Sequence, residues 1–223
     1  MIPAILIALL EIFICLSLAA SHRLRNSVKL TALQGIALAL LPFALWNWQG
    51  TLPPWTMWCA AVITCAVKAV LLPKLITRTM EQTGVKKEVE PLLNLSASLG
   101  ICGAAAIILL AVTSRFTAYL YVSLLVTASL LTLFTGLLII CSRRKAITQV
   151  LGFLVLENGI AFFAAAMQLE YGIFIELGIL LDLLVLVFLM GIATFKIRSE
   201  FSHIDTDRLN TLREEDDEIV EEK

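Results

Sequence analysis

Residues 118–141 read AYLYVSLLVTASLLTLFTGLLIIC, an apolar stretch without a single charged side chain. A helix needs about 20 consecutive, mostly apolar residues to cross a bilayer, and this stretch is long enough. Its residues do not alternate between polar and apolar, as they would along a membrane β-strand. We therefore predict a transmembrane helix here.

The same pattern recurs along most of the chain. Of the 223 residues, 59% are hydrophobic and the mean hydropathy is +0.90, whereas soluble domains are about 45–50% apolar. We predict an all-α integral membrane protein with about seven transmembrane helices. The predicted spans are about 2–20, 29–48, 56–77, 95–114, 118–141, 147–168 and 172–196.

The first predicted span differs from a cleaved signal peptide. No basic residue precedes it, a basic cluster follows it, and Glu11 lies where the apolar core of a signal peptide carries no charge. We expect this span to be retained as a membrane helix.

Lysine and arginine are concentrated in every second connection between the predicted spans. They lie between spans one and two, three and four, and five and six, and after span seven, whereas the other connections contain only Arg115. Cytoplasmic loops of membrane proteins are enriched in these residues. We therefore predict that the N-terminus lies outside and the C-terminus in the cytoplasm.

Spans one to three and five to seven have the same layout, in which a basic connection precedes the middle helix. The middle helices contain the similar tripeptides Gln34-Gly35-Ile36 and Asn158-Gly159-Ile160. This layout is consistent with a parallel three-helix repeat. We divide the chain into an N-terminal three-helix block, a cytoplasmic loop with a linking helix, a second three-helix block and an acidic cytoplasmic tail, at 1–80, 81–117, 118–196 and 197–223.

Four ionisable residues, Glu11, Lys68, Glu157 and Asp182, fall near the middle of predicted spans. A charge at this depth costs roughly 2.5–3.5 kcal/mol on insertion scales, and such groups often mark an ion or proton path. Three acids and one base at similar depth predict a relay. The alternative is a static pair between Lys68 and a glutamate that only fixes helix packing.

The relay would centre on the last two predicted helices. Glu157 and Asp182 each lie about ten residues into their helix, which is near the midplane at 1.5 Å per residue. A short link joins these helices, so the two carboxyls are expected within one helix-pair distance. Lys68 would be the switchable base, and Glu11 a further station or a lateral partner. Hydrogen bonds within the bundle are expected from three amides, those of Gln34, Gln149 and Asn158.

Small residues in spans four and six predict close contacts between helices. In span four these include Gly100 and Gly103, and in span six they are Ala161 and 164–166.

Other kinds of site are not favoured by the sequence. The five cysteines and two histidines form no closely spaced set of metal ligands. Phosphate-binding loops, zinc-protease motifs and nucleophile elbows are missing. No basic arm with interleaved aromatic residues suggests a nucleic-acid partner. We expect no metal, no cofactor and no bond chemistry on this chain.

One region resembles a known respiratory subunit. The basic residues 143–145 are followed in the next predicted helix by Leu-Glu-Asn-Gly-Ile at 156–160. The region of about 118–210 resembles the small three-helix K-type subunit of respiratory complex I. Nearly the whole chain resembles component E of membrane-bound NiFe hydrogenases of the hydrogenase-4/formate hydrogenlyase type. The features that fit component E are Leu-Leu-Asp-Leu-Leu at 180–184, Lys68 before Leu71-Leu72-Pro73, and Asp205-Thr206-Asp207-Arg208-Leu209.

The resemblance implies a non-catalytic membrane-arm subunit that couples redox chemistry on other chains to proton or sodium movement. The NiFe centre and the iron–sulfur clusters would belong to partner subunits. The implied partners are antiporter-like and quinone-subunit-like membrane subunits and the peripheral arm of a hydrogenase, in the inner membrane of a prokaryote. Glu157 and Asp182 would correspond in kind to the buried glutamates of the K-type proton path, although Asp182 is an aspartate.

Two other functions remain open at this point. The chain could be a subunit of a multi-subunit cation/proton antiporter, which would use the same carboxyls without redox partners. It could also be a structural scaffold in which the buried charges are static. A stand-alone transporter is disfavoured, because the sequence shows no obvious broken helix or solute pocket. The tail at 197–223 is either a solvated terminus or a docking segment for a cytosolic subunit.

Overall fold

The computed structural model describes residues 2–21, 23–46, 52–83, 93–117, 119–143, 145–167 and Gly191. These residues form long helices joined by short connections. The elements are α1 (Ile2–Ala19), α2 (Leu24–Leu45), α3 (Trp55–Thr64), the π-helical segment η1 (Cys65–Leu71), α4 (Leu72–Thr83), α5 (Leu95–Phe116), α6 (Leu120–Ser142) and α7 (Ala146–Ala166).

Six of the predicted spans are confirmed as helices that are long and apolar enough to cross a membrane. The third of them, Trp55–Glu81, is continuous over 27 residues and includes α3, η1 and most of α4. The predicted seventh span at 172–196, which contains Asp182, and the tail at 197–223 lie outside the described residues apart from Gly191. The chain is a multi-pass α-helical membrane protein.

Two helix boundaries differ from the prediction by five residues or more. The helix α2 begins at Leu24 and not at 29, and α4 ends at Thr83 and not at 77. The predicted spans stopped at the basic and polar residues near the membrane boundary, whereas the helices include Arg25 and Arg78. Long basic side chains can lay their stems along a helix and keep their charge in water. The exposed Arg25 guanidinium lies 3.8 Å from the exposed Glu81 carboxylate of α4, which places this end of both helices at the aqueous boundary.

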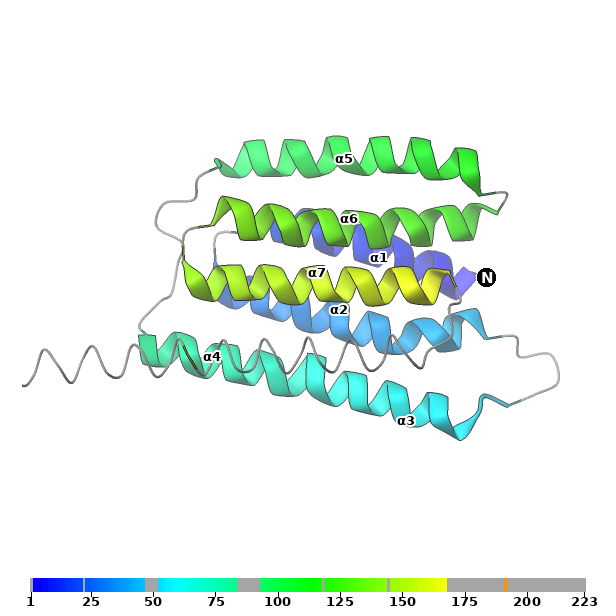
Figure 1. Ribbon diagram of the computed structural model, residues 1–223, viewed down its shortest axis with the longest axis horizontal. Helices are drawn as coiled ribbons and strands as arrows, with labels where there is room; N and C mark the ends of the chain where they lie inside the picture. The colour runs from blue at the N-terminus through cyan, green and yellow to red at the C-terminus, as the bar shows by residue number, and fades with distance from the viewer. Residues whose placement is uncertain are drawn as a thin grey trace, which may run out of the picture.

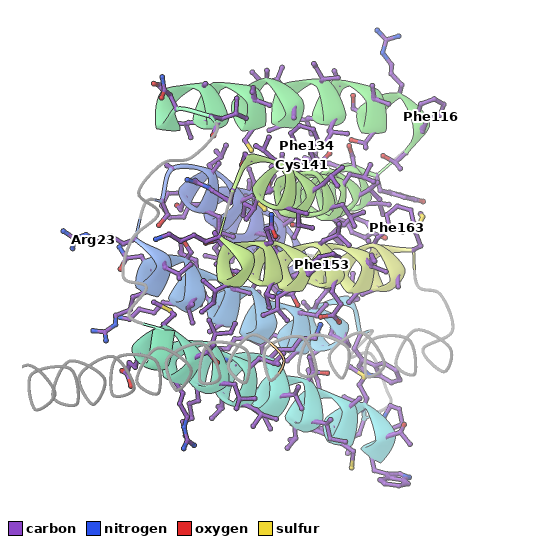
Figure 2. All side chains as sticks on the ribbon, turned by 60° about the vertical axis from the view of Figure 1, so that its left-hand side comes forward. Arg23, Phe116, Phe134, Cys141, Phe153 and Phe163 are labelled. Atoms are coloured by element: carbon purple, nitrogen blue, oxygen red, sulfur yellow. The ribbon has the colours of Figure 1, made fainter. Side chains whose placement is uncertain are left out.

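The helices form a bundle with α5 at one edge and the α3–α4 span at the opposite edge (Figure 1). Between them α6 and α7 make the most extensive contact, α1 packs on α6, and α2 packs on α7 and on η1. The ends of α1, α4 and α6 lie at the same end of the bundle as the starts of α2, α5 and α7 (Figure 1). Arg23 extends from this end, which we call the basic end, and Phe116 from the other (Figure 2).

Glycines allow the central helices to approach closely. A Cβ on Gly136 of α6 would lie 2.5 Å from the backbone nitrogen of Leu156, and a Cβ on Gly159 of α7 would lie 2.6 Å from that of Leu133. Small residues at such contacts are how membrane helices pack without a hydrophobic driving force between them. The sequence had pointed to the alanines of span six, and Ala164, Ala165 and Ala166 are indeed buried.

The corresponding prediction is wrong for the two glycines of span four within the described part of the chain. No atom there comes within 4 Å of a Cβ built on Gly100 or on Gly103 of α5. The reason is position, because α5 lies at the edge of the bundle (Figure 1) and Gly100 and Gly103 face away from the other described helices.

The buried apolar side chains form layers on both sides of the bundle centre. One cluster fills the half away from the basic end and includes Leu41, Leu125 and Phe162. Another fills the basic half between α2, α4 and α7, and consists of Leu24, Val28, Leu72, Ile76, Met80, Ile147, Val150, Leu151 and Leu154. The polar residues described next lie between these layers along their helices.

Candidate functional site

The centre of the site is an ion pair between Lys68 of η1 and Glu157 of α7. Lys68 is 8% exposed and Glu157 is 2% exposed. The Lys68 ammonium donates a hydrogen bond to Oε1 of Glu157 and another, of 3.0 Å, to the side-chain oxygen of Asn158. Lys68 lies in the middle of the span Trp55–Glu81, so the pair lies far from either helix end.

Lys68 occupies a locally widened turn of its helix. Across η1 the backbone bonds run from residue i to i−5, as in the bond from the Leu72 N–H to the Val67 carbonyl. Pro73 is the second residue after η1 and has no N–H, so it cannot complete the usual bond to the carbonyl four residues before it. Isolated π turns within α-helices occur frequently at functional sites. The π turn therefore sets the direction of the helix face that carries Lys68.

A glycine on the neighbouring helix makes room for this arrangement. A Cβ built on Gly35 of α2 would lie 2.7 Å from Cβ of Lys68 and 3.2 Å from its carbonyl carbon. Carbon atoms in contact normally lie about 3.5–4.0 Å apart. The backbone of α2 can therefore approach η1 only because position 35 has no side chain, and this close approach keeps Lys68 between α2 and α7.

Glu11 belongs to a second buried polar cluster, between α1, α2 and α6. It is 0% exposed, and its Oε1 accepts hydrogen bonds from Nε2 of Gln34 at 2.7 Å and from the Thr132 hydroxyl at 3.0 Å. The Cys15 thiol lies 3.2 Å from the same hydroxyl. Among the described residues, Oε2 of Glu11 and Oε1 of Gln34 have no hydrogen-bond partner. The partners of Glu11 in this part of the chain are thus neutral.

The helix α2 separates the two clusters. Gln34 reaches Glu11 on one side, whereas the next residue, Gly35, contacts Lys68 on the other. None of the hydrogen bonds of Glu11 within the described helices goes to Lys68. Of the four residues predicted to form a relay, the structure brings Lys68 and Glu157 together, places Glu11 apart, and leaves Asp182 outside its described residues.

Hydroxyl groups continue the polar lining along α6. Thr113 of α5 hydrogen-bonds to Thr127 at 2.7 Å and to Ser123 at 3.1 Å, on the half of α6 away from the basic end. Thr132 lies further along α6, where it reaches Glu11, and Thr135 lies 3.8 Å from the Cys102 sulfur. Several of these hydroxyls also bond to the carbonyl one turn back, as is common for serine and threonine inside helices.

Some of these partners could be predicted and others could not. The amides of Gln34, Asn158 and Gln149 do form the expected hydrogen bonds, that of Gln149 going to the Arg143 carbonyl at 3.0 Å. The sequence did not single out Thr132 or the π turn. Pro73, inside a span and shortly after a buried lysine, was the available signal for the π turn.

Within the described helices, no three histidine, cysteine, aspartate or glutamate side chains converge on a point where they could hold a metal ion. The expectation that this chain holds no metal stays a prediction.

The fold and the site together define a multi-pass α-helical membrane protein with a lysine–glutamate pair buried between its spans. The chain is 30% identical over 199 residues to Rv0085, an uncharacterized protein of Mycobacterium tuberculosis, and the match covers 86% of this chain and 87% of that protein. The chain therefore belongs to the same family as Rv0085. No protein-family model matches the sequence, and no solved structure matches it.

Proposed function

We propose that this chain is a membrane-arm subunit of an energy-converting NiFe hydrogenase complex, in which it carries protons or sodium ions across part of the membrane. The observation that carries the proposal is the Lys68–Glu157 pair, because an ion pair buried in mid-span is costly to maintain and is typical of ion paths. The resemblance to component E supplies the redox partners.

The geometry around Lys68 suits a group that changes partners. Its ammonium donates both to Glu157 and to the neutral oxygen of Asn158. When Glu157 takes up a proton, Asn158 still accepts a hydrogen bond from Lys68, so the lysine is never left without an acceptor. The π turn adds a helix segment whose hydrogen bonds can rearrange.

Glu11 would form a second station in this proposal. It lies at a similar depth to the pair but on the other side of α2, and the hydroxyls of α6 extend from it toward the end of the bundle opposite the basic end. Asp182 would complete the path from the seventh span, as the sequence predicts. The Glu11 cluster would then serve the end of the bundle opposite the basic end, and the Lys68–Glu157 pair would serve the basic end.

The proposed topology has the N-terminus outside and the C-terminus in the cytoplasm, in the inner membrane of a prokaryote. Basic residues of the connections at the basic end support it. The packing of α1 on α6 and of α2 on α7 supports the parallel repeat, since equivalent helices of the two blocks then lie side by side. The NiFe centre and iron–sulfur clusters would be on partner chains, which include antiporter-like and quinone-subunit-like membrane subunits.

Purification of the native complex through the C-terminal tail, followed by mass spectrometry and metal analysis, tests the assignment. The proposal predicts antiporter-like subunits together with nickel- and iron-containing chains. Antiporter-like chains without nickel would instead indicate a multi-subunit cation/proton antiporter, and this chain alone would contradict both.

The role of the buried charges is tested by ion pumping in the intact complex. Glu157→Gln and Asp182→Asn are each expected to reduce coupled pumping while the complex still assembles. Glu81→Gln is the matched control, because Glu81 is an exposed carboxylate at the basic end and its loss should leave pumping unchanged. Wild-type pumping in both buried variants would refute the relay, and loss of assembly would favour a structural scaffold.

A further inference from the structure

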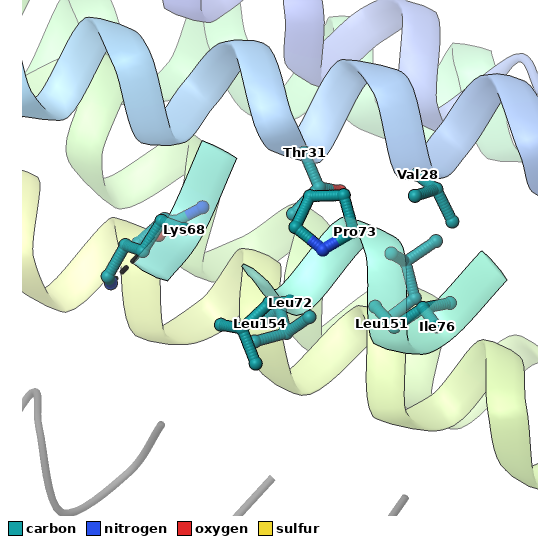
Figure 3. Close-up of a pocket in the computed structure, with 9 residues that line it drawn as sticks. Val28, Thr31, Lys68, Leu72, Pro73, Ile76, Leu151 and Leu154 are labelled. Atoms are coloured by element: carbon teal, nitrogen blue, oxygen red, sulfur yellow. Dashed lines mark hydrogen bonds between the residues drawn. The ribbon is translucent and has the colours of Figure 1, made fainter. Parts of the chain in front are cut away.

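A small cavity lies beside the ion pair, on the side that faces the basic end. It leaves about 10 Å³ open to the centre of a water molecule, which is room for about one water. Its polar walls are Lys68, Asn158 and Thr31, and its apolar walls include Leu72 and Leu151. Figure 3 shows it extending along the α3–α4 span from Lys68 to Ile76. A cavity with several polar groups can hold water.

A second cavity of similar size, about 10 Å³, lies between the first cavity and the basic end of the bundle. Four of its lining residues are polar, namely Ser21, Ser27, Arg143 and Thr148, and the other four are the apolar residues Leu18, Leu24, Ile139 and Leu151. Ser21 and Arg143 belong to connections at the basic end, so this cavity is close to the aqueous phase there.

The two cavities share one wall, the side chain of Leu151 on α7. Polar groups continue past it on α2, because Ser27 lines the second cavity and Thr31, one helical turn further, lines the first. The Thr31 hydroxyl donates to the Ser27 carbonyl at 3.0 Å. Leu151 belongs to the buried apolar cluster between α2, α4 and α7 and is only 1% exposed.

We propose that water reaches Lys68 from the basic end through these two cavities, and that Leu151 is the residue that closes the path. An apolar constriction between polar cavities can exclude water when closed and admit it after a small displacement of one side chain. The inference rests on the proposed role of Lys68 in proton transfer and adds the route by which the proton arrives and the residue that controls it.

The proton step along this route is balanced. The Lys68 ammonium gives one proton to the Glu157 carboxylate, which leaves a neutral amine and a neutral acid. The amine then takes a proton from a hydronium ion in the first cavity, and that ion becomes water. The net change is one proton moved from the basic end to Glu157, with Lys68 charged again.

Cysteine accessibility tests the route without depending on any partner subunit. The five native cysteines are first replaced, and single cysteines are then introduced by Ser27→Cys, below Leu151, and by Thr31→Cys, above it. Inside-out and right-side-out membrane vesicles containing the full-length chain are treated with a small, positively charged, membrane-impermeant thiosulfonate reagent. Val62→Cys serves as a control for side chains that face lipid, since Val62 is 65% exposed on α3.

The expected pattern separates the two positions. Ser27→Cys should be labelled only from the basic end and at a rate that does not depend on residue 151. Thr31→Cys should be labelled slowly from the same end, and adding Leu151→Ala should raise its rate by about tenfold or more, which corresponds to a barrier lowered by at least about 1.4 kcal/mol. The Val62→Cys control should not be labelled from either side.

Three results would overturn the proposal. They are labelling of Thr31→Cys from the opposite end, an unchanged rate on adding Leu151→Ala, and no labelling of Thr31→Cys even with Leu151→Ala while Ser27→Cys reacts. Normal labelling in a chain whose complex does not pump would leave the route intact and refute the proposed function instead. The two failures can thus be told apart.

Discussion

The close approach of α2 to η1 predicts opposite effects for the same substitution at two helical glycines. Gly35→Ala places a methyl group 2.7 Å from Cβ of Lys68 and 3.2 Å from its carbonyl carbon. Neither atom is the far end of a flexible side chain, so the two helices must move apart by most of an ångström to reach an ordinary carbon contact of about 3.5 Å. Gly100→Ala is the control, because nothing described lies within 4 Å of its added Cβ.

The magnitude follows from two contributions. Replacing glycine by alanine inside a helix favours folding by roughly 0.5–1 kcal/mol at either position, so this contribution cancels when the two variants are compared. Overpacking at Gly35 costs about 1–3 kcal/mol. We therefore expect Gly100→Ala to be as stable as the parent or slightly more stable, and Gly35→Ala to be less stable than Gly100→Ala by about 1–3 kcal/mol.

The assay is equilibrium unfolding of the full-length chain in mixed micelles, followed by tryptophan fluorescence, with both variants measured beside the parent. The change at Gly35 should also disturb the ion pair, so pumping in the intact complex should fall for Gly35→Ala and not for Gly100→Ala. Equal stabilities of the two variants would refute the reasoning, because they would show that α2 and η1 are not in contact at Lys68.

Three further predictions concern the charged residues and use the same unfolding assay. Lys68→Met and Glu157→Leu should each destabilise the chain by about 3–5 kcal/mol, because each leaves a buried charge without its partner. The double variant should cost much less than the sum of the two single variants, and additive costs would show that the two residues do not interact. Glu11→Gln should change stability little, because the new amide oxygen can accept from the same donors and the new NH₂ group can donate to the Gln34 oxygen, which has no partner among the described residues. Glu11→Leu should cost about 1–3 kcal/mol. Equal costs for the two variants would contradict the hydrogen-bonded cluster. Arg25→Gln should change stability by less than about 1 kcal/mol, because its pair with Glu81 is exposed, and a larger loss would show that the pair is buried.

The sequence predicts how deep each buried group lies in the membrane better than it predicts toward which neighbouring helix the group points. Hydropathy places the spans, and counting along a helix at about 1.5 Å per residue gives depth, which is why Glu11, Lys68 and Glu157 were all expected near the centre. Which groups meet depends on the rotation of each helix and on which helices are neighbours. Each span carries apolar residues on all of its faces, so the sequence pattern of a single helix does not say which face is buried in the protein.

Lys68 and Glu11 illustrate the difference. A π turn holds an additional residue, so the side chains after it point in other directions around the helix axis than they would in a regular α-helix. In the sequence, only Pro73 suggested such a turn. Glu11 was expected to be a further station or a lateral partner of the other charges. The neighbours of α1 turned out to be α2 and α6, whose amide and hydroxyl groups bind it. The same lack of neighbour information explains why the glycines of α5 were expected in contacts that they do not make with any described residue.

The position of α2 also links the two buried clusters mechanically. Two consecutive residues of this helix, Gln34 and Gly35, contact Glu11 on one side and Lys68 on the other. One planar peptide unit joins the Cα atoms of these two residues, so a slide or rotation of α2 changes both sets of distances at once. If proton transfer within the Lys68–Glu157 pair lets η1 shift against Gly35, the shift therefore also alters the hydrogen bonds of the Glu11 carboxyl, which the pair does not contact.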